Sequence, residues 1–165
     1  PTAESWGLLG RIYKDRWEQS AGRLGGAITA QAWLDEAINA YTKGFQTDLR
    51  AHYPGINAVH LMWMRNRDDP RWTELLEVVR YSAMLAANSA KPHYWDFATM
   101  METAIYRQDM EEAVSWLTKA VTAQPTPMEA SSTLATIERL RKIIDPEKSD
   151  AYWDQIVNTL RDATK

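Results

Sequence analysis

The paired acidic residues of this sequence are poorly placed for catalysis. Adjacent carboxylates occur at Asp35-Glu36, Asp68-Asp69 and Glu111-Glu112. Neighbouring side chains on a helix point in different directions, so such pairs favour solvation and the helix dipole over shared acid–base chemistry. There is no Gly-x-Ser-x-Gly or His-Glu-x-x-His string, and the glycine-rich segment 22–26 lacks the Lys-Ser/Thr of a phosphate loop. We therefore expect a protein that is not an enzyme.

Residues that could bind a metal are also sparse. The three histidines, His52, His60 and His93, lack His-x3-His spacing and have no carboxylate cluster beside them. Cysteine is absent, which excludes a disulfide scaffold, a thiolate zinc site and a thiol nucleophile. The sequence predicts no metal and no cofactor.

Polar residues of the first predicted helix could instead bind a partner. Arg11, Lys14 and Asp15 follow an aromatic-rich helix face, at positions where helical repeats often present side chains to a concave surface. We interpret them as a docking patch. The alternative is that Arg11 and Asp15 form a solvated i,i+4 ion pair, worth only about 0.2–0.5 kcal/mol.

Two further sets of candidate residues lie in later predicted helices. Asn57 and His60 are three residues apart, so they share a helix face and could reach a peptide backbone, although Asn57 could equally be a capping or turn residue. Trp95 and Asp96 could place an aromatic ring and a carboxylate at the rim of a groove, and Glu102 completes this partner-binding set. For Asp96 the alternative is an N-cap, because a short acceptor satisfies the free amides of a helix start.

Helices must position these side chains, because almost no stretch alternates apolar and polar residues as a half-buried strand does. Apolar residues recur at steps of three and four along five segments, which is typical of one buried helix face. These five segments are 34–45, 72–83, 110–121, 134–144 and 153–160. We expect an all-α protein.

Helix-start signals agree with this periodicity. Asp69 before Pro70 and Asp145 before Pro146 each predict an N-cap followed by proline at the first helical position. The segment 126–129, Thr-Pro-Met-Glu, predicts a capping box.

The spacing of residues indicates a tetratricopeptide-like repeat. Trp6, Leu9, Gly10 and Tyr13 match the first-helix pattern, and Ala37, Tyr41 and Gly44 match the second. We predict a single domain over 1–165, in which helical hairpins stack into a short right-handed solenoid. The expected boundaries are repeat 1 at about 3–49 with an inserted loop at 19–32, repeat 2 at about 55–88, repeat 3 at about 94–123, and C-terminal helices at about 127–164.

Charge and hydropathy exclude other classes of partner. The 19 basic and 22 acidic residues give a net charge of −3 with no basic stripe, which argues against nucleic acid. No apolar run approaches the roughly 20 residues of a membrane span, and the start has no signal-peptide pattern. We expect a cytoplasmic location without membrane contact, and the first residue, Pro1, suggests a piece of a longer protein.

Three strings point to a family: Gly10-Arg11-Ile12-Tyr13-Lys14-Asp15, Pro54-Gly55-Ile56-Asn57-Ala58-Val59, and Tyr94-Trp95-Asp96. Together they resemble the TRAFs-binding domain family, the helical part of the regulatory region of apoptosis signal-regulating MAP kinase kinase kinases. This resemblance implies a tetratricopeptide-type scaffold that docks partners and positions a neighbouring effector domain. The sequence itself contains no kinase motif.

We therefore expect a non-catalytic protein–protein interaction module that docks a partner segment, or an effector domain of the same chain, on its concave face. The alternative is a self-association or intramolecular packing module, in which a second copy or the effector domain covers the apolar surface. A third possibility is a helical binder of a small ligand that uses the eight tryptophans.

Overall fold

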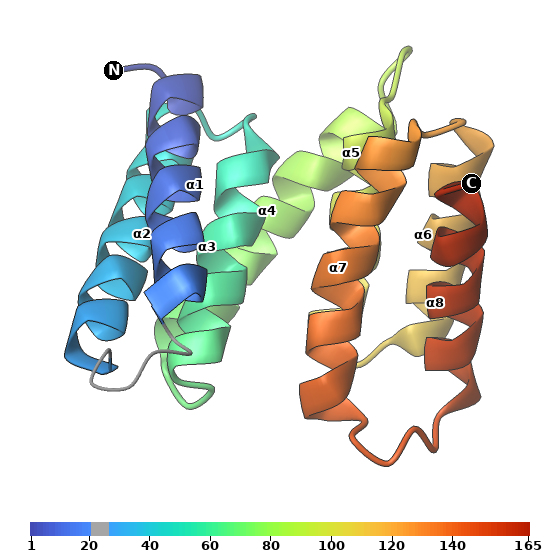
Figure 1. Cartoon of the computed structure of the whole chain (residues 1–165). Coiled ribbons are helices and arrows are strands. Elements are labelled where there is room, and N and C mark those ends of the chain that lie inside the picture. The colour runs from blue at the N-terminus through green and yellow to red at the C-terminus, as the bar shows by residue number, and fades with distance from the viewer. Residues whose placement is uncertain (21–26) are drawn as a thin grey trace. The chain divides into compact units, whose positions relative to one another are not determined.

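The computed structural model describes residues 1–20 and 27–165, and within these ranges every regular element is an α-helix (Figure 1). The all-α prediction is therefore confirmed. The helices are α1 (Ala3–Ser20), α2 (Ala27–Thr47), α3 (His52–Arg65), α4 (Pro70–Ala87), α5 (Tyr94–Tyr106), α6 (Met110–Thr122), α7 (Pro127–Ile144) and α8 (Ala151–Ala163).

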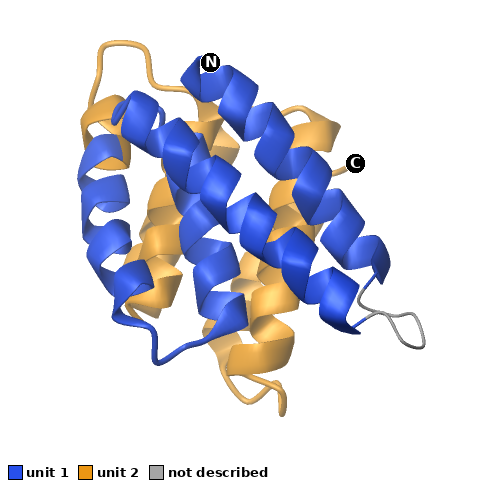
Figure 2. Cartoon of the chain, turned by 90° about the vertical axis from the view of Figure 1, so that its left-hand side faces the viewer, with its two compact units in different colours: residues 1–82 blue, residues 83–165 orange. Residues whose placement is uncertain are grey.

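The chain divides into two compact units, Pro1–Ser82 and Ala83–Lys165 (Figure 2). The boundary falls inside helix α4. The predicted inserted loop at 19–32 is too long: α1 continues to Ser20 and α2 begins at Ala27. The rest of that predicted loop, 21–26, lies outside the described residues.

Unit 1 is built around the hairpin of α1 and α2, with α3 packed against both helices. Its core contains apolar residues from α2 and α3, flanked by partly buried hydrophobic residues from α1 and α4. The buried members are Leu34, Ala37, Ile38, Tyr41, Ala58, Leu61 and Met62, and the flanking ones are Tyr13, Trp17, Trp72 and Leu75. These α2 residues carry the three-and-four spacing from which the helix was predicted.

Two glycines allow the helices of unit 1 to approach closely. A Cβ atom on Gly10 of α1 would lie 2.7–2.9 Å from three ring carbons of Tyr41, which is fully buried in α2. A Cβ atom on Gly55 of α3 would lie 2.5 Å from Cγ2 of Val79 in α4. No side chain fits at either position without moving its neighbour.

Unit 2 combines the hairpin α5–α6 with the hairpin α7–α8, which also contact each other. Its cores contain Met100 and Ala120 with the partly buried Phe97 and Trp116, and Trp153 of α8 is fully buried. A buried hydrogen bond joins α5 to α7, because the Tyr94 and Thr133 hydroxyls lie 2.7 Å apart.

Of the predicted helix starts, two are confirmed and one is wrong. Helix α4 begins at Pro70 after Asp69, and Thr126 and Glu129 form the capping box of α7. Asp145 instead ends α7, where its carboxylate accepts hydrogen bonds from the Ser149 amide and hydroxyl at 2.9 and 3.0 Å. Helix α8 starts only at Ala151.

We predict that Gly10→Ala lowers the free energy of unfolding by about 1–3 kcal/mol, because the added methyl group overlaps the immobile Tyr41 ring. Gly7→Ala is the matched control on the same helix, since its nearest neighbours are ring atoms of Tyr53 at 3.8–3.9 Å. That control should be neutral or stabilising by up to about 1 kcal/mol through helix propensity. Urea unfolding of both variants measures the difference; equal stabilities would contradict the close packing.

We also predict a loss of stability in alkali that depends on Tyr94. Burial raises the pKa of Tyr94 to about 12, opposed by the hydrogen bond with Thr133 and aided by Glu102 and Glu129. The folded state thus favours the neutral phenol, and its contribution is complete below pH ~10 and lost as the pH rises through ~12. Denaturant titrations from pH 8 to 12 should show a shallower decline for Tyr94→Phe than for the unmodified chain. Identical slopes would contradict this assignment.

Candidate functional site

A groove with a cavity of about 400 Å³ lies between α1 and α3 of unit 1. We call it the α1/α3 groove, and it is lined by Ala3, Glu4, Gly7, Leu8, Arg11, Ala51, Tyr53 and Pro54. Its apolar side chains are accessible, with Leu8 59% and Tyr53 42% exposed. Large exposed apolar groups inside a concave surface favour a binding function.

The helical spacing of α1 builds one wall of this groove. Glu4, Leu8 and Arg11 are separated by four and three residues, so they share one helix face. Gly7 lies beside them and leaves the Tyr53 ring uncovered, because it has no side chain. The Tyr53 ring packs edge-on against Tyr41, with a centroid distance of 6.3 Å and an interplanar angle of 79°. The second wall is therefore anchored to the core.

The groove carries two charges, those of Glu4 and Arg11. Glu4 and Arg11 are both exposed, and neither has an ion pair or side-chain hydrogen bond within residues 1–20 and 27–165. Arg11 also forms no ion pair with Asp15 over those ranges, which argues against the solvated-pair interpretation. The guanidinium is available to a partner.

The buried Tyr41 hydroxyl lies in the electrostatic field of this groove. Burial raises the pKa of Tyr41 strongly, the neighbouring Tyr53 and the charge of Asp15 raise it further, and the charge of Arg11 lowers it. Tyr41 therefore remains a neutral phenol, and it does not compensate the charge of Arg11.

The structure brings together two of the sequence-predicted residues beside this groove. The Lys14 ammonium donates to the Asn57 Oδ1 atom at 3.4 Å, and the Asn57 amide donates to the Tyr53 carbonyl at 2.9 Å. Asp15 is exposed on α1. His60 is only 2% exposed, so its side chain lies in the packed interior although it shares a helix with Asn57.

The other three predicted residues lie in α5 of unit 2. Trp95 is half-buried and packs edge-on against Tyr94, with centroids 5.2 Å apart. Asp96 is 8% exposed and accepts a hydrogen bond from the His93 amide at 2.7 Å, so it caps α5 from the third helical position, with His93 as the N-cap residue. The charge of half-buried Glu102 contributes to the raised pKa of Tyr94.

Sequence reasoning missed Glu4, Leu8 and Tyr53. For Glu4 and Leu8 the signal was their helical spacing, because they stand seven and three residues before Arg11 and so share its helix face. Tyr53 carried no comparable local signal, since only the packing of α3 against α1 places it in the groove.

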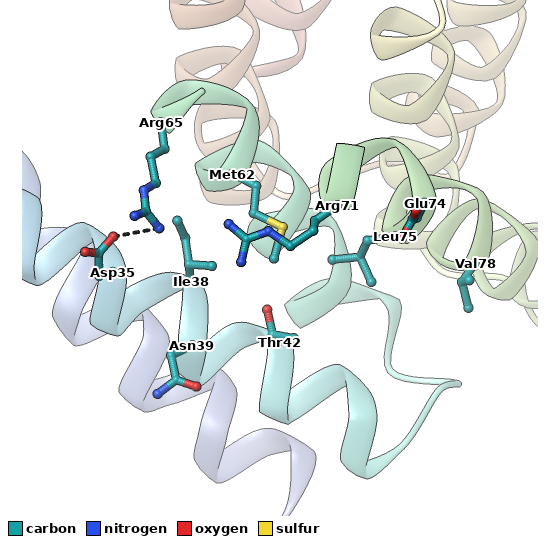
Figure 3. Close-up of a pocket in the computed structure, with 10 residues that line it drawn as sticks. All are labelled: Asp35, Ile38, Asn39, Thr42, Met62, Arg65, Arg71, Glu74, Leu75 and Val78. Carbon is teal, nitrogen blue, oxygen red and sulfur yellow. Dashed lines mark ion pairs between the residues drawn. The ribbon is translucent and has the colours of Figure 1, made fainter. Parts of the chain in front are cut away.

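A second pocket of about 500 Å³ lies between α2, α3 and α4 of unit 1 (Figure 3). Its apolar floor includes Ile38, Met62 and Leu75. Its arginines have partners in the same unit: Arg65 pairs with Asp35 at 2.9 Å, and Arg71 pairs with Asp69 at 2.6 Å. The Arg71 guanidinium lowers the pKa of Asp69 to about 2. Since these charges are already compensated, the α1/α3 groove is the better candidate for recognition.

The described part of the chain offers little support for other kinds of site. Within it, no group of three or more His, Asp or Glu side chains is arranged to hold a metal ion. None of its helices combines the length and apolar character that crossing a membrane requires.

The helical hairpins are consistent with a helical-repeat fold of the tetratricopeptide type. Residues 1–62 match the family model described as Tetratricopeptide Repeats-Sensor. This range covers α1, α2 and most of α3, and it includes all residues that line the α1/α3 groove. The match supports a tetratricopeptide-like family, and it does not extend to the TRAFs-binding domain in particular. Searches of curated proteins and of solved structures returned no match.

Proposed function

We propose that this chain is a non-catalytic interaction and regulatory module that docks a protein segment in the α1/α3 groove. The segment could belong to another protein or to an effector domain of the same protein. The single observation that carries this proposal is an open groove with exposed Leu8 and Tyr53 beside Arg11, which has no ion pair with any residue that the structure describes.

Three further facts support docking. Tetratricopeptide-like repeats generally bind proteins and are generally not catalytic, and the matched family is described as a sensor. The groove walls are fixed by the close approach of Gly10 to Tyr41 and by the Tyr41–Tyr53 contact, so little conformational entropy is lost when a ligand binds. The resemblance of 10–15 and 54–59 to the TRAFs-binding domain family involves the same two helices.

The second candidate function is self-association, and exposed apolar residues of α4 favour it. Val78 and Tyr81 are 46% and 60% exposed, and Val78 lines the pocket of Figure 3. Light scattering after gel filtration tests this function directly. A dimer that Tyr81→Glu dissociates would support it.

We predict that Leu8→Glu weakens peptide binding in the groove. Random peptides displayed on phage are selected on the unmodified chain, and the affinities of the best synthetic peptides are measured by fluorescence anisotropy. Leu8→Glu should weaken them at least ~10-fold, because it places a charge among the apolar contacts.

Ile28→Glu is the matched control, since Ile28 is 87% exposed on α2 and does not line the groove. It should bind the peptides like the unmodified chain, and circular dichroism should show all three proteins folded. Failure to select any peptide, or equal affinity for the Leu8→Glu variant, would overturn the proposal.

A further inference from the structure

The charges of the α1/α3 groove have a fixed order along α1. Glu4 stands at one end, Leu8 lies between, and Arg11 stands at the other end. The seven residue-to-residue steps from Glu4 to Arg11 span about 10 Å along a helix axis. The groove therefore presents a carboxylate, an apolar surface and a guanidinium in sequence.

Among the described residues, neither Glu4 nor Arg11 has a partner of opposite charge. Glu4 and Arg11 have no ionic or hydrogen-bonded side-chain partner in the described ranges, whereas Arg65 and Arg71 of the second pocket are paired with Asp35 and Asp69. A charge that is exposed and unpaired adds specificity when a ligand supplies the opposite charge. The contrast with these paired arginines makes Arg11 the better candidate for binding a charged group of a ligand.

We propose that the groove recognises a bipolar peptide segment, in which an acidic residue faces Arg11, a basic residue faces Glu4, and an apolar side chain between them packs on Leu8 and Tyr53. This inference rests on the proposed docking function and names the partner's chemistry. An extended peptide advances about 3.3 Å per residue, so the acidic and basic residues stand about three positions apart. The planar guanidinium of Arg11 suits a carboxylate, which it can hold through two hydrogen bonds.

The surroundings of Arg11 are compatible with an incoming carboxylate. Tyr41 is neutral and contributes no negative charge. The charge of Asp15 acts on the neighbouring Tyr41, and Asp15 lies beyond Arg11, one helical turn further from Glu4. The acidic residue that faces Arg11 should therefore be the last acidic residue of the bound segment, because a further one along α1 would be repelled by Asp15.

The experiment is the same phage selection, repeated on charge-reversed chains and read out by peptide sequence. Peptides selected on the unmodified chain should be enriched in an acidic and a basic residue about three positions apart. Selection on Arg11→Glu should lose the acidic preference and enrich peptides with two basic residues. Peptides from the first selection should bind Arg11→Glu about 10-fold more weakly than the unmodified chain. Their affinity for this variant should also depend less on the salt concentration.

Lys142→Glu is the matched control, because Lys142 is exposed on α7 in unit 2 and its reversal changes the net charge equally. It should select the same peptides as the unmodified chain. If Arg11→Glu and Lys142→Glu changed the charges of the selected peptides in the same way, the preference would follow net charge, and the inference would be overturned.

The outcomes separate this inference from the docking function. Peptides that are lost on Leu8→Glu but show no charge enrichment would leave docking intact and overturn bipolar recognition. A concentration-dependent dimer that Leu8→Glu dissociates would identify a second copy as the occupant and overturn it as well.

Discussion

The contact between Gly10 and Tyr41 is the constraint on which unit 1 depends. The absence of a side chain at Gly10 lets α1 lie directly on the Tyr41 ring. That ring is fully buried and belongs to the core cluster with Leu34 and Leu61. The helix that carries the groove residues is thereby fixed to the helix that carries most of the core.

The same ring connects packing to recognition. Tyr41 contacts Tyr53 edge-on, and Tyr53 forms the α3 wall of the groove. A groove whose wall rests on a fully buried side chain keeps its shape without a ligand, which lowers the entropic cost of binding. The site thus depends on the interior of the hairpin as well as on its surface residues.

Electrostatics distinguishes the two hollows of unit 1. In the pocket of Figure 3, the arginine charge of Arg65 is paired with the carboxylate of Asp35, which lines the same pocket. In the α1/α3 groove, Glu4 and Arg11 have no such partner within the described ranges. Compensated charges mainly hold local structure, whereas uncompensated ones can discriminate between ligands.

The sequence by itself determined the local features of this protein. Apolar spacing within α2, proline after Asp69 and the capping box at Thr126 and Glu129 act over a few residues, so helix identity and two helix starts could be predicted. The start assigned to Asp145 failed because a donor in the following turn, Ser149, competes for its carboxylate.

Only the tertiary structure decided which helix faces are covered. Asn57 and His60 share a face by spacing, yet Asn57 remains half-exposed beside Lys14 while His60 is 2% exposed. Residue spacing likewise did not predict that Tyr53 lies in the groove or that the chain divides into two units. Spacing fixes the relation of side chains along one helix, but burial depends on neighbouring helices that are distant in the sequence.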